Sequence, residues 1–211
     1  MKKLLDRIFI DGLGGMAQGL FATLIIGTII QQIGLFMGGG TGDLIYELGK
    51  IAAGLTGAGI GVGVARKLEA GHLVIVSAAV VGMIGAFAGK ILSGQVLVDG
   101  NLVLAGPGEP LGAFAAAYLA IEIGILISGK TKLDIILTPL VCIGTGSAVG
   151  LFVGPPISEF MLWLGSLINW GTEQQPFLMG IVVSVLMGMI LTLPISSAAL
   201  GVILNLSGLA A

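Results

Sequence analysis

The sequence predicts an all-α fold, a polytopic transmembrane helix bundle with broken or re-entrant segments in the C-terminal third. Of the 211 residues, 56% are hydrophobic and only 9% are charged, whereas soluble domains carry about 25% charged residues. Long apolar stretches recur along the chain, and prolines interrupt the last of them. Because so few charged side chains cannot cover a water-soluble surface, we expect much of the protein to face a lipid bilayer.

Six stretches have roughly the length that a helix needs to cross the hydrocarbon core, about 20 apolar residues. They are Leu13–Met37, Leu48–Val64, Leu73–Leu92, Leu111–Ser128, Ile135–Val153 and Phe177–Leu193. Two apolar pieces fit less well, because residues 157–170 are too few and residues 195–211 follow a proline. We expect residues 1–211 to form a single transmembrane domain.

The first residues predict a surface helix and not a cleaved signal peptide. Residues 1–10 have the pattern of a short amphipathic helix lying on the membrane, with Leu4, Leu5, Ile8 and Phe9 apolar and Lys3 and Arg7 polar. The apolar stretch that follows is longer than the 7–15 residues of a signal-peptide core.

The positions of lysine and arginine predict the orientation. If the helices alternate, seven basic residues fall on one side of the membrane and only Lys50 and Lys90 on the other. Basic loops favour the cytoplasm, so the N-terminus is predicted to be cytoplasmic. The seven are Lys2, Lys3, Arg7, Arg66, Lys67, Lys130 and Lys132. Residues 95–104 carry β-prone residues around Asp99-Gly100 and predict a hairpin on the opposite side.

The composition excludes several classes of function. A net charge of −2 argues against a nucleic-acid partner. One cysteine, Cys142, and one histidine, His72, exclude a disulfide within the chain and a zinc site of the usual kind. We expect no metal, no cofactor and no catalytic residues, and we interpret Cys142 as a small buried apolar residue.

Glycine, with 37 residues, predicts close helix packing. In the second span, Gly57 and Gly61, and likewise Gly59 and Gly63, are four residues apart and leave a smooth groove along one helix face. Such grooves let membrane helices approach closely. A packing face is the favoured interpretation, and a hinge or a pathway lining is the alternative.

Carboxylates in apolar surroundings are the first candidates for function. Glu122 lies in the middle of the fourth span, where a charge costs about 2.5–3.5 kcal/mol. It must face protein, water or a ligand, or be protonated, and a hydrogen bond to another helix is favoured over a substrate role. Glu109 precedes Pro110 at the start of that span, which fits either a helix cap or a polar site.

The C-terminal third combines prolines with polar side chains. Glu173, Gln174 and Gln175 precede Pro176 and offer donors and acceptors suited to the hydroxyls of a sugar. Ser196 and Ser197 follow Pro194, which should break or kink a helix. Gly154-Pro155-Pro156 should end the fifth span, leaving residues 157–170 as an interfacial helix or one arm of a re-entrant hairpin. Transporters build substrate sites from such interrupted segments.

Several motifs resemble the enzyme IIC-like membrane family of the bacterial phosphotransferase system, which includes perfringolysin regulatory-protein-like members. They are Gly19–Gly27, Ala120–Gly124, Ser128–Asp134, Val153–Ser158, Thr172–Gly180 and Met187–Ala198. The resemblance implies a multi-pass protein of the bacterial inner membrane that forms homodimers and works with a cytoplasmic phosphotransferase component. Family members usually continue by about another third, so we expect a fragment or a short form. No IIA or IIB domain is recognisable, so phosphorylation by this chain alone is not expected.

These observations lead to two functional hypotheses. The first is a permease that binds and translocates a sugar or similar polar metabolite. Its polar lining would be Glu109, Glu122, Glu173, Gln174, Gln175, Ser196 and Ser197. The alternative is a membrane sensor or regulator that binds a ligand and signals to a cytoplasmic partner without transport. Flux in liposomes separates the two hypotheses.

Overall fold

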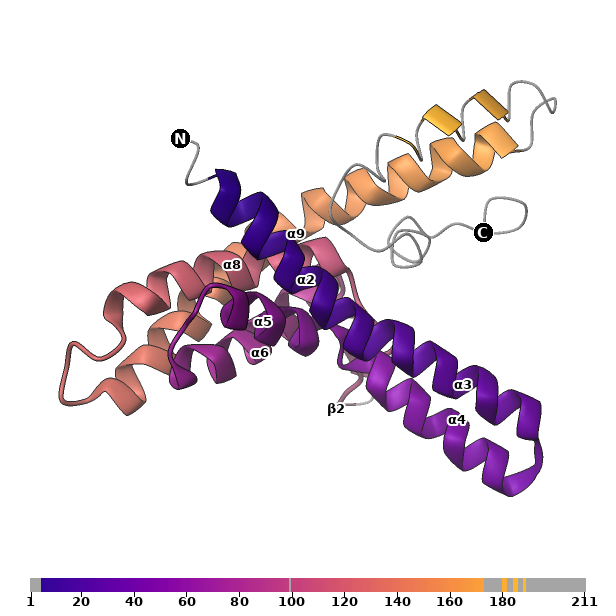
Figure 1. The fold of residues 1–211 in the computed structure, drawn as a ribbon, viewed down its shortest axis with the longest axis horizontal. Helices are drawn as coiled ribbons and strands as arrows, with labels where there is room; N and C mark the ends of the chain where they lie inside the picture. Colours follow the sequence, from indigo (N-terminus) through magenta and orange to yellow (C-terminus); the bar gives the residue numbers. More distant parts are fainter. Residues whose placement is uncertain (1–4, 99, 173–179, 182–183, 186–187, 189–211) are drawn as a thin grey trace.

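The structure of the protein is a computed structural model that describes residues 5–98, 100–172, 180–181, 184–185 and 188. The predicted all-α bundle is confirmed (Figure 1). In chain order the elements are η1 (Arg7–Gly12), α2 (Leu13–Leu20), η2 (Phe21–Ile25), α3 (Ile26–Met37), α4 (Gly39–Gly54), α5 (Thr56–Lys67), α6 (His72–Ala86), α7 (Ala88–Leu92), β1 (Leu97–Val98), β2 (Asn101–Leu102), α8 (Pro110–Ile127) and α9 (Asp134–Thr172). The predicted sixth span, Phe177–Leu193, lies largely outside the described residues, and residues 195–211 lie wholly outside them. The same is true of five predicted site residues: Glu173, Gln174, Gln175, Ser196 and Ser197.

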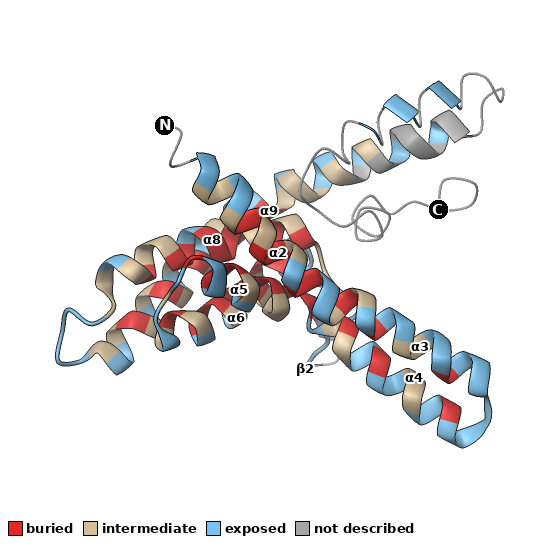
Figure 2. Ribbon diagram, viewed as in Figure 1, coloured by how far each residue is buried: buried red, intermediate tan, exposed pale blue. Residues whose placement is uncertain are grey.

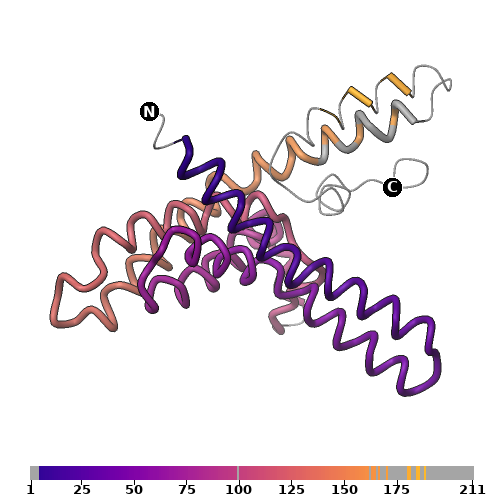
Figure 3. Tube along the Cα trace, in the orientation of Figure 1, coloured from indigo at the N-terminus to yellow at the C-terminus, as the bar shows by residue number. Residues whose placement is uncertain are grey.

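The first helix is longer than predicted. Residues from η1 to α3 form one continuous helix, Arg7–Met37, whose course is visible as an unbroken tube (Figure 3). The expected separate surface helix over residues 1–10 is therefore wrong for its described part. The reason is local, because Asp11 and Gly12 keep helical geometry and Leu13 continues it at φ −66° and ψ −31°.

A bend divides the second predicted span. The chain turns at Gly38 and Gly39, both with positive φ, and α4 then runs to Gly54. Between α4 and α5 the axis bends by 50°. The Thr56 hydroxyl, fully buried, donates to the Ala53 carbonyl oxygen at 2.6 Å, so a polar group released at the bend has a partner.

Helices α3 and α4 form an arm that extends away from the rest of the bundle (Figure 1). Its outer surface is exposed and apolar, whereas buried residues concentrate where α2, α5, α6 and α8 meet (Figure 2). The seam between α3 and α4 is made by glycine: a Cβ on Gly27 would lie 2.6 Å from the Ala53 nitrogen.

The centre of the bundle is held by backbone-to-backbone approaches at glycine. A Cβ on Gly15 of α2 would lie 2.6 Å from the Gly63 carbonyl oxygen of α5. A Cβ on Gly57 of α5 would lie 2.6 Å from the Gly82 oxygen of α6, and one on Gly85 the same distance from the Gly112 oxygen of α8. Real Cβ atoms do not approach so closely. The packing role predicted for the glycines of the second span is therefore confirmed, but they form two faces and not one, because Gly57 and Gly61 face α6 whereas Gly59 and Gly63 face the first helix.

The third predicted span, Leu73–Leu92, also differs from its prediction. Helix α6 covers only His72–Ala86, because the backbone breaks at Phe87, and the short α7 follows. The predicted hairpin is present: β1 and β2 pair antiparallel with Leu97 opposite Leu102, and Gly100 takes a positive φ in the turn.

The end predicted at Gly154-Pro155-Pro156 is wrong. Helix α9 continues through Pro139, Pro155 and Pro156 to Thr172, so residues 157–170 are not a separate interfacial helix. Packing explains the continuity. Gly146 lies against Val81 and Ala120, and Gly154 lies against Ala88. A proline removes one backbone donor, but neighbouring helices can hold such a helix together.

By length and composition, three helices among the described residues can cross a membrane: Arg7–Met37, Pro110–Ile127 and Asp134–Met161. The bent pair α4 and α5 makes a fourth if it is counted as one span. These helices establish a multi-pass membrane protein.

The glycine contacts generate a matched test within one helix. We expect Gly15→Ala to lower the free energy of unfolding by about 1–3 kcal/mol, because the added methyl group meets the α5 backbone. Its neighbour Gly14 has nothing within 4 Å of the same atom, so Gly14→Ala should be neutral or stabilise the helix by up to about 1 kcal/mol. Unfolding in detergent followed by circular dichroism measures both, and equal losses would contradict the packing account.

Candidate functional site

A polar pocket lies where the chain segment around the hairpin meets α7, the start of α8 and the middle of α9. Its volume is about 670 Å³, within the range of small-molecule sites. Apolar and glycine residues form much of its wall, and the polar side chains come from four different parts of the chain. They are Lys90, Ser93, Gln95, Glu109 and Ser158.

Glu109 is fixed in the pocket wall as the N-cap of α8. Its Oε1 accepts the Leu111 N–H at 3.1 Å, its Oε2 accepts the Gly112 N–H, and Pro110 begins the helix. Its own N–H donates to the Ala86 carbonyl oxygen at 2.7 Å, which ties α8 to the end of α6. The cap is thus one role of Glu109, and the same carboxyl group also lines the pocket.

Glycine is required immediately before this cap. Gly108 has a φ of +72°, and a Cβ there would lie 2.7 Å from the Ala86 Cβ. Both the backbone conformation and the space therefore exclude a larger residue. The position of Glu109 depends on this close approach.

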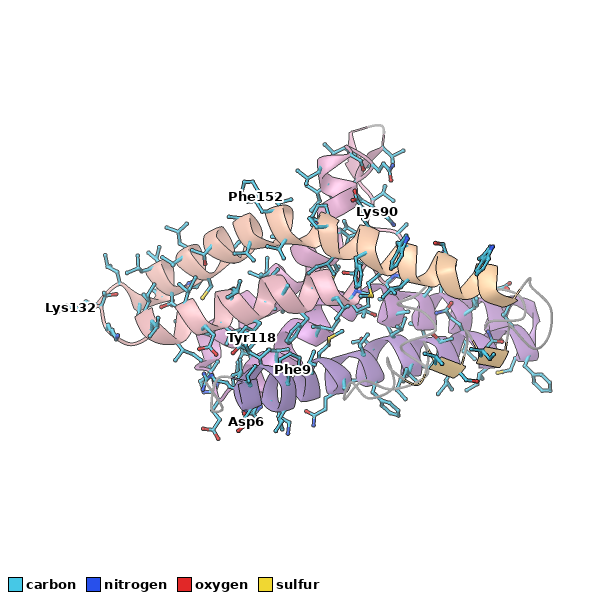
Figure 4. The ribbon with its side chains drawn as sticks, turned by 90° about the horizontal axis from the view of Figure 1, so that it is seen from above. Asp6, Phe9, Lys90, Tyr118, Lys132 and Phe152 are labelled. Atoms are coloured by element: carbon cyan, nitrogen blue, oxygen red, sulfur yellow. The ribbon has the colours of Figure 1, made fainter. Side chains whose placement is uncertain are left out.

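Lys90 closes another side of the pocket. Its Nζ donates to the Ala105 carbonyl oxygen at 3.0 Å and lies 5.4 Å from the centre of the Phe87 ring. Figure 4 shows Lys90 beside the hairpin, which projects from the bundle. No ion pair joins Lys90 to Glu109 in the described part of the chain. Both residues line the pocket wall.

The electrostatics of Glu109 are unusual for a surface carboxylate. Burial raises the pKa of its carboxyl group, while the N–H groups of Gly112 and Leu111 act in the opposite direction. A carboxyl group with a perturbed pKa in a pocket is typical of functional sites, although structural caps also perturb pKa values.

Glu122 does not line this pocket but pairs with Arg7 of the first helix. It accepts a hydrogen bond from Arg7 Nε at 2.6 Å and a second from Nη2 at 3.4 Å. The Arg7 side chain is 40% exposed and the Glu122 side chain is 32% exposed. The favoured expectation is a buried hydrogen bond between Glu122 and another helix; the hydrogen bond is present, but both side chains are only partly buried. The Tyr118 hydroxyl is buried beside this pair.

The structure therefore separates the two described candidates. At 1.5 Å per residue, Glu109 and Glu122 lie about 20 Å apart along α8. The other five, Glu173, Gln174, Gln175, Ser196 and Ser197, are outside the described residues, so a lining shared by all seven stays a prediction. Sequence reasoning missed Lys90, Ser93, Gln95 and Ser158 as pocket residues. Lys90 could have been noticed, because it is a charged residue at the end of an apolar stretch.

Within the described residues, no three His, Cys, Asp or Glu side chains lie close enough together to hold a metal ion. Cys142 is buried in the main apolar cluster, as its interpretation from sequence expected. The polar side chains of the pocket carry hydroxyl, amide, ammonium and carboxyl groups, which can bind a polar ligand through hydrogen bonds and charge.

The fold and the pocket together define a multi-pass membrane protein with a polar pocket at one end of its bundle. The sequence matches the family described as "Phosphotransferase system, EIIC" over residues 10–211. The chain belongs to this family, as the sequence motifs had suggested. Comparisons with curated proteins and with solved structures give no match.

The Arg7–Glu122 pair generates a prediction about helix association. We expect a double-mutant cycle with Arg7→Gln and Glu122→Gln to give a coupling energy of about 1 kcal/mol, because the pair is half-buried and joins two membrane helices. Unfolding of the four proteins in detergent measures it.

A second ion pair supplies the control. Lys50 and Glu47 are 3.7 Å apart on one helix with mostly exposed side chains, and the same cycle there should give about 0.3 kcal/mol or less. A coupling at Arg7–Glu122 no larger than this would show that the pair does not hold the first helix to α8.

Proposed function

We propose that the protein is an EIIC-type permease of the bacterial inner membrane that binds and translocates a sugar or a similar polar metabolite. The family membership over residues 10–211 is the observation that carries the proposal. The pocket at Glu109 supplies it with a candidate site in the described part of the chain.

The chemistry of the pocket supports a polyhydroxylated ligand. Carboxylate and amide oxygens accept hydrogen bonds from hydroxyl groups, and the ammonium and amide N–H groups donate to them. Glu109 and Gln95 provide the first kind, and Lys90 and Gln95 the second. Ser93 and Ser158 can do both.

The distribution of basic residues supports the orientation. It predicts that the N-terminus is cytoplasmic and that the pocket faces the opposite side. In this arrangement the pocket is the outer part of the solute path, and a homodimer works with a cytoplasmic phosphotransferase component that supplies the phosphoryl group. Glu122, Glu173, Gln174, Gln175, Ser196 and Ser197 remain candidates for deeper parts of the path.

The test combines binding with flux. A panel of sugars is titrated against the purified protein, and a sugar that binds is then offered to proteoliposomes. We expect Glu109→Gln, which keeps an acceptor for the α8 cap, to weaken binding at least about tenfold, the loss typical of a hydrogen bond to a charged group. Glu159→Gln is the matched control, because Glu159 is exposed and adjacent to Ser158.

Three outcomes decide the matter. Binding with flux, lost in Glu109→Gln and kept in Glu159→Gln, supports the permease. Binding without flux supports a sensor or regulator. No binding of any sugar by the intact protein, or equal binding by both variants, contradicts a solute site at Glu109.

A further inference from the structure

A second cavity lies at the other end of α8, far from the pocket at Glu109. It is an open groove of about 360 Å³ at the start of α9. Four of its six lining residues are leucine or isoleucine: Leu133, Ile136, Leu137 and Leu140. Leu133, Ile136 and Leu140 are 66%, 64% and 67% exposed. An exposed apolar surface of this kind is suited to contact with lipid hydrocarbon.

The mouth of this groove is basic. Lys132 and Thr131 line it, Lys130 is two residues away in the chain, and Figure 4 shows Lys132 at the tip of the loop between α8 and α9. Both lysines are exposed, and no ion pair joins either of them to a carboxylate among the described residues. Two positive charges are therefore free at the edge of an apolar surface.

Among the described residues, the acidic residue nearest in sequence, Asp134, forms no ion pair with either lysine. The Oδ1 atom of Asp134 accepts hydrogen bonds from the Gly129 N–H at 2.8 Å and from the Thr138 hydroxyl at 2.6 Å. It serves to order the loop and begin α9.

More positive charge lies at this end of the bundle. Arg66 and Lys67 end α5, and the turn that follows them approaches the α8–α9 loop, since a Cβ on Gly71 would lie 3.4 Å from the Ser128 hydroxyl oxygen. Glu69 is the acidic residue of that turn. A ligand with a negative charge and a hydrocarbon chain is complementary to this combination.

We propose that this groove binds an anionic phospholipid, with an acyl chain along Leu133, Ile136 and Leu140 and the phosphate at Lys130 and Lys132. The site is independent of the proposed solute path, because about 27 Å of α8 separates the two ends. The positive-inside bias assigns this end to the cytoplasmic leaflet, where anionic lipids attract basic residues beside a membrane helix.

The test is native mass spectrometry of the full chain in detergent, titrated with phosphatidylglycerol or with phosphatidylcholine of the same acyl chains. Phosphatidylglycerol should bind more tightly. The double variant Lys130→Gln/Lys132→Gln should weaken its binding about 30-fold, from about 1 kcal/mol for each lysine. Lys50→Gln, an exposed lysine on α4, should leave it unchanged.

A groove variant distinguishes the acyl chain from the head group. Ile136→Trp adds bulk at an exposed position, so the fold should persist while phosphatidylglycerol binding falls. Equal affinity for the two lipids, or no effect of the lysine substitutions, would overturn the proposal. Competition by inorganic phosphate alone, unaffected by Ile136→Trp, would also overturn it, because it would indicate a phosphate site without a lipid.

Discussion

The close approach of helix backbones at glycine is the constraint on which the rest of this structure depends. Lipid tails are as apolar as leucine, so burial of apolar surface does not drive membrane helices together, and tight packing must do so. At Gly15, Gly57 and Gly85 the facing groups are backbone atoms of the next helix. These contacts link α2 to α5, α5 to α6, and α6 to α8, and so build the centre of the bundle.

The position of the polar pocket follows from this packing. Gly85 and Gly108 bring the end of α6 against the start of α8, which places Glu109 where its N–H meets the Ala86 carbonyl oxygen. α9 passes the same place, because Gly150 lies against Ala116 and Gly154 against Ala88, and it contributes Ser158 to the pocket. The glycine contacts thus position the elements that carry the polar side chains of the pocket.

The sequence predicted the elements that local chemistry determines. The spacing of glycines predicted a packing face, Asp99-Gly100 predicted the hairpin, and Glu109-Pro110 predicted the start of α8. It failed where neighbouring helices override a local signal. Pro155 and Pro156 do not end α9, because packing beside Gly154 preserves the helix. The bend near Leu55 could not be predicted from a proline, because none lies there. The pocket could not be predicted, because Lys90, Glu109 and Ser158 meet only in three dimensions.

The central claim is that the pocket at Glu109 opens to the outside of the membrane and binds the solute. Its most direct test is to measure how accessible the pocket is with and without bound solute. Cys142 is the one cysteine of the sequence and is buried, so Ser158→Cys in a Cys142→Ala background places a single reactive thiol in the pocket wall. We predict that a membrane-impermeant maleimide added outside right-side-out vesicles labels this thiol, and that a solute identified by binding slows the labelling. Absence of external labelling, or labelling unaffected by a bound solute, would contradict the account.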